Sequence, residues 1–78
     1  MAEFSYKIEK DLGILSENKD YTKRITLTAW KNREAKIDIR DWKDFDNEEE
    51  REAMKGITLT KEEARKLRDI LNEMELEG

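Results

Sequence analysis

The chain has 78 residues, and 16 Lys and Arg stand against 20 Asp and Glu, so its formal net charge is −4 at pH 7. Only 36% of the residues are hydrophobic and 46% are charged, which predicts a single small domain over residues 1–78 with a thin core. Cysteine and histidine are absent, which removes disulfides, thiolate metal sites and the commonest general base. We therefore expect no enzyme, no metal and no other cofactor, and we expect chains to associate to reinforce the small core.

No stretch of the sequence approaches the roughly 20 apolar residues that a membrane span requires. Residues 1–10 lack the apolar core of a signal peptide, and proline, repeats and linker-like segments are absent from the chain. We therefore expect a cytoplasmic protein without a membrane partner.

Alternation of apolar and polar residues predicts three successive strands, over residues 6–15, 21–31 and 35–42. In the second strand, Ile25 and Leu27 share the face that we expect to be the apolar side of a sheet. A short turn separates the second strand from the third, so these two strands should form a hairpin.

The acidic segment 44–54 follows, and it lacks the spaced ligands of a calcium loop, so a solvated loop is favoured over a metal site. Gly56 then leads into a short strand over residues 57–59, and Thr60 with Glu63 forms a capping box that starts a helix. The apolar positions of this helix have helical spacing. They are Ala64, Leu67, Ile70, Leu71 and Met74. The order predicts an α+β fold, in which a four-stranded antiparallel sheet precedes one C-terminal helix.

The face of the second and third strands opposite Ile25 and Leu27 combines two tryptophans with several cations. It carries Arg24, Thr26, Thr28 and Trp30 together with Lys36, Asp38, Arg40 and Trp42. Flat rings between positive charges suit a single nucleic-acid strand, because bases stack on the rings and cations follow the phosphates. Three alternatives stay open: a second small core or dimer contact, a protein-interaction surface, and single-stranded RNA as the ligand. For Asp38 and Asp41, pairing with a neighbouring cation is favoured over catalysis.

Residues 37–40 (IDIR) are followed by an aromatic residue, and residues 55–60 (KGITLT) are followed by a helix that contains Glu63. In this order they resemble the signature of the positive cofactor four family, the transcriptional coactivators that bind single-stranded DNA. The likeness is closest to the small bacterial YdbC-like members and spans roughly residues 21–74.

The resemblance implies a homodimer in which curved antiparallel sheets form grooves for single-stranded DNA, and in which the transcription or replication machinery is a possible partner. Arg40 and Lys55 would contact phosphates, and Trp30 and Trp42 would stack bases. Further contacts are expected from strand positions, and these are Lys23, Arg24 and Lys36. The helix side chains that would divide between the core and the dimer interface are Leu67, Ile70, Leu71 and Met74.

Overall fold

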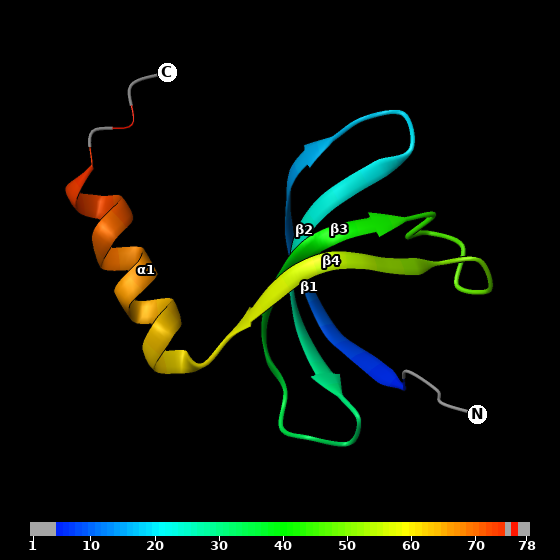
Figure 1. Cartoon of the computed structure of the whole chain (residues 1–78), viewed down its shortest axis with the longest axis horizontal. Coiled ribbons are helices and arrows are strands. Elements are labelled where there is room, and N and C mark those ends of the chain that lie inside the picture. Colours follow the sequence, from blue (N-terminus) through cyan, green and yellow to red (C-terminus); the bar gives the residue numbers. More distant parts are fainter. Residues whose placement is uncertain (1–4, 75, 77–78) are drawn as a thin grey trace.

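The computed structural model describes residues 5–74 and residue 76. Four strands form one antiparallel sheet in chain order, and a single helix follows it (Figure 1). The strands are β1 (Tyr6–Glu17), β2 (Tyr21–Trp30), β3 (Lys36–Lys43) and β4 (Glu52–Leu59), and the helix is α1 (Lys61–Glu73). The predicted α+β fold is therefore confirmed.

The fourth strand is longer than its predicted span of residues 57–59. β4 already begins at Glu52, and Ala53 pairs with Trp42 within what we expected to be an acidic loop. A shift of register between Arg40 and Trp42 interrupts the pairing of β3 with β4. Because such a bulge breaks the alternation of side chains, the sequence pattern hides the first half of this strand.

Gly56 lies inside β4 and does not mark the start of a strand. A Cβ atom at this position would lie 2.0 Å from the Cβ of Arg40 and 2.5 Å from the carbonyl oxygen of Ile39. No side chain fits at such distances, so only glycine lets β4 approach β3 this closely. This contact fixes the backbone of Arg40 against its neighbour.

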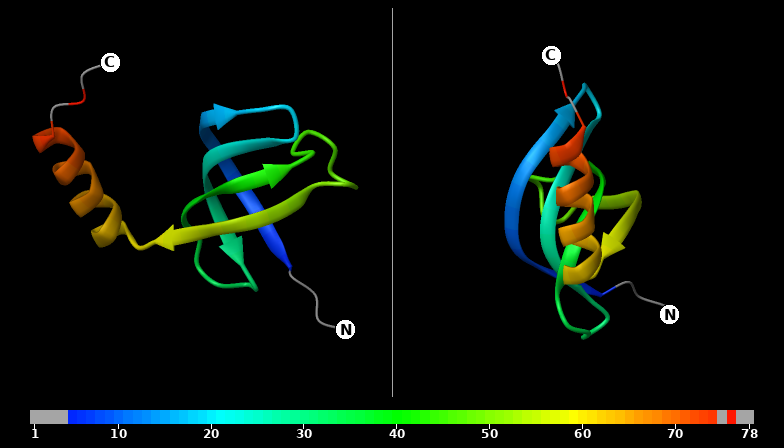
Figure 2. Two further views of the ribbon diagram at one scale, coloured as in Figure 1. Left: turned by 45° about the horizontal axis from the view of Figure 1, so that its top comes forward. Right: turned by 90° about the vertical axis from the view of Figure 1, so that its left-hand side faces the viewer.

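The long first strand bends strongly around the rest of the sheet (Figure 2). Its pairing with β2 shifts register at three places, between Ile8 and Lys10, between Asp11 and Gly13, and between Ile14 and Ser16. Each bulge bends a strand and increases its twist. The bulges also account for the broken alternation of residues 6–15 in the sequence.

The sheet curls so far that its two ends meet across one face. Thr22 pairs with Trp42, so Trp30 stands eight residues further along β2, about 26 Å away in a flat sheet. The Tyr6 ring nevertheless lies 5.1 Å from the Trp30 ring and 5.6 Å from the Trp42 ring, measured between centroids. We call this inner side the concave face. It comprises Thr22, Arg24, Thr26, Thr28 and Trp30 of β2 and Lys36, Asp38, Arg40 and Trp42 of β3.

Burial in this fold is concentrated on the concave face, and not on the apolar side of the sheet to which Ile25 and Leu27 belong. Trp42 is the one buried hydrophobic side chain among the residues that the structure describes. The buried polar and charged residues share its face, and they are Arg24, Thr26, Thr28 and Asp38. Ile25 and Leu27 are only half-buried on the opposite, convex face. A curled sheet encloses its inner face by itself, whereas its outer face requires a cover.

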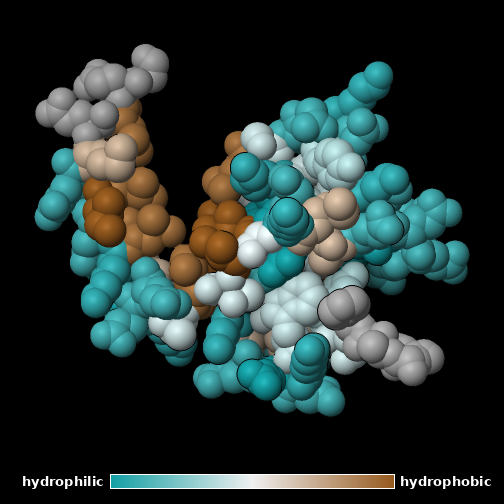
Figure 3. Space-filling model, in the orientation of Figure 1, coloured by the Kyte–Doolittle hydropathy of each residue, from teal (hydrophilic) through white to brown (hydrophobic). Residues whose placement is uncertain are grey.

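The helix begins as predicted but does not supply that cover. Thr60 Oγ1 accepts a hydrogen bond from the Glu63 amide (3.0 Å), and Glu63 Oε1 accepts one from the Thr60 amide (2.9 Å), which confirms the capping box. No residue of α1 is buried, and Ile70 and Met74 are 57% and 50% exposed. Apolar atoms on α1 and on the sheet face each other across an open gap (Figure 3). Within the described ranges, no helix is long and apolar enough to cross a membrane.

Candidate nucleic-acid interface

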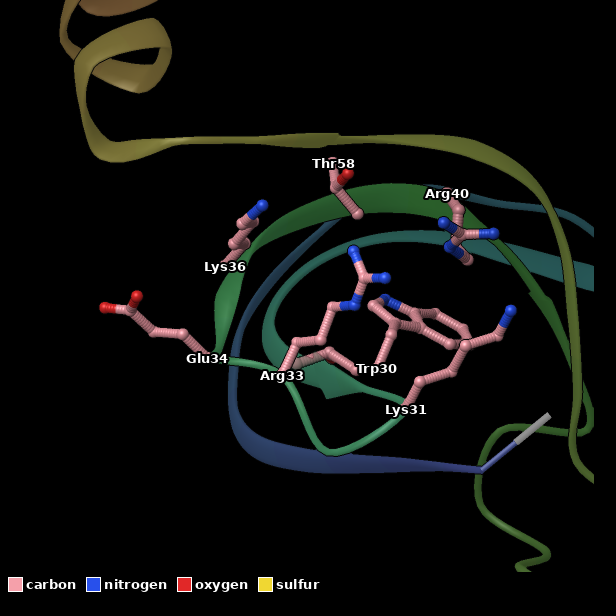
Figure 4. Close-up of a pocket in the computed structure, with 8 residues that line it drawn as sticks. Trp30, Lys31, Arg33, Glu34, Lys36, Arg40 and Thr58 are labelled. Carbon is pink, nitrogen blue, oxygen red and sulfur yellow. The ribbon is translucent and has the colours of Figure 1, made fainter.

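A hollow of about 410 Å³ opens on the concave face beside the connection between β2 and β3 (Figure 4). Its lining consists of Thr28, Trp30, Lys31, Arg33, Glu34, Lys36, Arg40 and Thr58. Four of these side chains are cationic and one is anionic, and the Glu34 carboxylate points away from Trp30. The hollow is thus a positively charged site with an aromatic ring in its wall.

A tight turn places two of the cations at the rim. Lys31 and Asn32 have positive φ angles of 53° and 62°, and the Arg33 amide donates a hydrogen bond to the Trp30 carbonyl (2.9 Å). Positive φ at both central residues and this hydrogen bond are features of a type I′ β-turn, which here begins the five-residue connection between β2 and β3. Asparagine adopts positive φ readily, whereas lysine does so at a cost in free energy. The Lys31 amide also donates to the Ser5 carbonyl (2.8 Å), which ties the turn to the start of β1.

The aromatic ring in the hollow belongs to Trp30, and its position is fixed by its neighbours. The guanidinium carbon of Arg40 lies over the indole, 4.7 Å from the ring centroid. The Tyr6 ring packs against the indole at an interplanar angle of 47°. Trp30 stays half-buried, so part of its surface is open to the hollow.

A buried carboxylate joins Trp30 to Arg40. Asp38 has no exposed surface, and its Oδ2 accepts hydrogen bonds from Trp30 Nε1 and from Arg40 Nη2, both at 2.9 Å. Its Oδ1 accepts a third from Arg40 Nε at 2.6 Å. The predicted pairing of Asp38 with a neighbouring cation is confirmed. Arg40 Nη1 also donates to the Met54 carbonyl (2.8 Å), so all three nitrogens of the guanidinium are bound within the protein.

The structure places Trp42 in the core, where it is unsuited to the base stacking expected of it. Its side chain has no exposed surface and packs against the rings of Tyr6 and Phe45, the latter edge-on with centroids 5.3 Å apart. Its Nε1 is a buried donor without an acceptor among the described residues. The curl of the sheet causes this difference, because it closes Tyr6 over the end of β3.

The family model for Transcriptional Coactivator p15 (PC4) matches residues 18–70, well over half of the chain. The chain belongs to this family. It is also 33% identical over 76 residues to an uncharacterized protein of Treponema pallidum (strain Nichols), an alignment that covers 96% of this chain and 85% of that protein. The family match includes the whole hollow. The narrower likeness to the YdbC-like members stays a prediction.

In this PC4-family chain, only some of the predicted contact residues meet at the hollow. Trp30, Lys36 and Arg40 line it. Arg24 is 6% exposed, and its Nη1 donates to Asp11 Oδ2 at 2.6 Å, so it is part of the core. Lys23 alternates with Arg24 along β2 and therefore belongs to the convex face.

Lys55 does not line the hollow, because it lies in the irregular part of β4 next to Gly56. The prediction from the sequence did not include two cations that do line the hollow, Lys31 and Arg33. They lie outside the strand alternation on which the prediction was based. The signal that could have revealed them is the run of cations around a two-residue turn directly after an aromatic residue.

A second hollow of about 280 Å³ lies at the other end of the concave face, between the β1–β2 turn and the β3–β4 loop. Asp20, Asp44 and Asp46 stand at its rim beside Lys19 and the ion-paired Arg24. Phosphates are attracted far less to such a mixture of charges than to the first hollow. In the part of the chain that the structure describes, no group of three or more acidic side chains is arranged to hold a metal ion.

Proposed function

We propose that this chain is a homodimeric, non-enzymatic protein that binds single-stranded DNA with little sequence preference. It would act in transcription, replication or repair in the cytoplasm, associated with the nucleoid and with the machinery of those processes. Membership of the PC4 coactivator family supports a nucleic-acid-binding role. The observation that carries the proposal is the half-buried ring of Trp30 within a hollow rimmed by Lys31, Arg33 and Lys36.

The proposed mechanism combines stacking with phosphate attraction. An unpaired base enters the hollow and stacks beside Trp30, which contributes about 1 to 3 kcal/mol per base. The flanking phosphates lie along Lys31, Arg33 and Lys36, none of which forms an ion pair within residues 5–74. A duplex keeps the faces of its bases stacked inside the helix, so it lacks the group that fits the hollow. Stacking does not distinguish base edges, hence the weak sequence preference.

Association of two chains is supported by the uncovered apolar surfaces. The helix exposes Leu71 and Met74 by 42% and 50%, and Ile57 on the convex face of the sheet is 54% exposed. Apolar atoms of the helix and the sheet border the same gap (Figure 3). A chain of this size with one buried hydrophobic residue among those described gains most of its stability from covering such surfaces. Leu67, half-buried, and Ile70 complete the helical side of the proposed interface.

The test is a fluorescence-anisotropy titration of a labelled oligo-dT of about 20 nucleotides at several salt concentrations. We expect binding that RNA and duplex DNA of the same length displace poorly. Trp30→Ala should weaken the binding by about 1 to 3 kcal/mol and leave the oligomeric state unchanged. Preferential displacement by RNA would identify RNA as the ligand. Absence of binding even at low salt would refute nucleic-acid binding and leave the surface to a protein partner.

Two lysine variants sharpen this titration. For single strands, the slope of log K against log salt changes by about 0.7 for each phosphate contact. Lys31→Gln removes a cation from the hollow, so we expect its slope to be shallower by about 0.7. Lys23→Gln removes the same charge from the convex face and should leave the slope unchanged. Equal slopes for the two variants would show that the hollow does not bind phosphates.

A further inference from the structure

Asp38 occupies an unusual place beneath the hollow. It is the one buried carboxylate in the described part of the chain, and its relative exposure is 0%. Burial of an ionised carboxylate is unfavourable unless hydrogen bonds and an opposite charge compensate it. Here all the compensation comes from Trp30 and Arg40, the two residues whose flat groups lie over each other in the hollow.

The hydrogen bonds determine how these two flat groups are arranged. The same oxygen, Asp38 Oδ2, accepts from the indole Nε1 of Trp30 and from Nη2 of Arg40. The other oxygen accepts from Arg40 Nε at 2.6 Å, and the Met54 carbonyl holds the remaining nitrogen. Neither group can rotate without loss of a hydrogen bond to a buried partner. The charge of Arg40 is neutralised at close range. One face of its guanidinium group lies over the Trp30 ring, and the hydrogen bonds of its three nitrogens use neither that face nor the opposite one.

We infer that Asp38 is a positioning residue that holds Trp30 and Arg40 as one stacking platform, to which Arg40 contributes its flat face and not a phosphate contact. The inference rests on the proposed function and names the groups on which the base stacks. Nucleic-acid bases stack on guanidinium planes as well as on aromatic rings. The phosphate contacts then fall to the cations at the rim, Lys31, Arg33 and Lys36.

A competing role for Arg40, the phosphate contact that the family resemblance implies, predicts the opposite response to one substitution. Asp38→Asn retains the size of the side chain and removes its negative charge. If Arg40 binds a phosphate, release of its charge should raise the affinity for oligo-dT and steepen the salt dependence. If Asp38 holds a stacking platform, the affinity should fall about tenfold with an unchanged salt slope. Tighter binding with a steeper slope would overturn the inference.

In the single variant Asp38→Asn, the charge of Arg40 loses its partner, and this loss could unfold the protein. The double variant Asp38→Asn with Arg40→Gln removes both charges and so avoids this problem. Circular dichroism reports whether it folds. We expect weaker binding and a salt slope equal to that of the wild type, whereas Lys31→Gln serves as the control with a slope shallower by about 0.7. A slope for the double variant that is also shallower by about 0.7 would assign a phosphate to Arg40 and overturn the inference.

The indole signals of the free protein test the positioning directly, without DNA. In a nitrogen-15 correlation spectrum, Asp38→Asn should shift the Trp30 indole signal, because that N–H loses its carboxylate acceptor. Trp42 provides the internal control, since its indole N–H has no partner among the described residues. An unmoved Trp30 signal overturns the positioning role. A shifted signal in a protein that binds no oligonucleotide refutes the proposed function and with it the platform, and leaves Asp38 a structural residue.

Discussion

In most small domains the apolar face of a sheet is buried and its polar face is exposed, whereas in this sheet the more polar face is the buried one. The concave face buries charged and hydroxyl side chains, such as Asp38, Thr26 and Thr28, around the single buried tryptophan. The convex face carries isoleucines and leucines and stays partly open, and Ile57 is 54% exposed. Curvature causes the contrast, because the inner face of a curled sheet is enclosed by the sheet itself. The proposed ligand site lies on this enclosed inner face, and the proposed second chain would cover the outer face.

The largest expected effect is a loss of protein stability, and it should distinguish the two tryptophans of the concave face. Trp42→Ala should reduce the free energy of unfolding by about 3 to 5 kcal/mol, since it removes the buried ring on which Tyr6 and Phe45 pack. Urea unfolding followed by circular dichroism measures this loss. Trp30→Ala is the matched control and should cost clearly less stability while it weakens DNA binding. Equal losses of stability would mean that the concave face does not divide into a core and a ligand site.

A charged substitution in the helix tests whether exposed apolar surfaces hold two chains together. Ile70→Glu places a charge on the exposed apolar side of α1. We therefore expect the free energy of dimer dissociation to fall by about 2 kcal/mol, which raises the dissociation constant of the proposed dimer about 30-fold. Sedimentation velocity over a range of concentrations measures it. Asn72→Glu adds the same charge on the other side of the helix and should leave the dimer intact. A wild-type chain that sediments as a monomer at every concentration would refute the proposed dimer.

The third expected effect concerns the close approach of β4 to Arg40, which lines the hollow. Gly56→Ala forces a Cβ atom into Arg40 and the Ile39 carbonyl, so it should destabilise the protein by about 1 to 3 kcal/mol. Gly13→Ala is the control, because nothing lies within 4 Å of its Cβ position. Thermal unfolding compares the two variants. If both melt at the temperature of the wild type, β4 does not need glycine against β3.

Much of the fold was predictable from local patterns. The alternation of Ile25 with Thr26 and of Ile37 with Asp38 indicated the central hairpin, and the side chains of Thr60 and Glu63 indicated where the helix begins. These signals depend on neighbours in the sequence. The register of β4 was missed for the opposite reason, since the bulge between Arg40 and Trp42 exists only where two strands pair.

The candidate site was predictable only in part. The sequence by itself determined that aromatic and cationic side chains share one face of β2 and β3, because alternation along a strand fixes the side on which each residue lies. Only the tertiary structure decided which of them line the hollow. The curl of the sheet encloses Trp42 and Arg24, and it leaves Trp30 at a hollow with Lys31, Arg33 and Lys36. Curvature arises from bulges and close approaches summed over several strands, and the alternation of a single strand does not contain it.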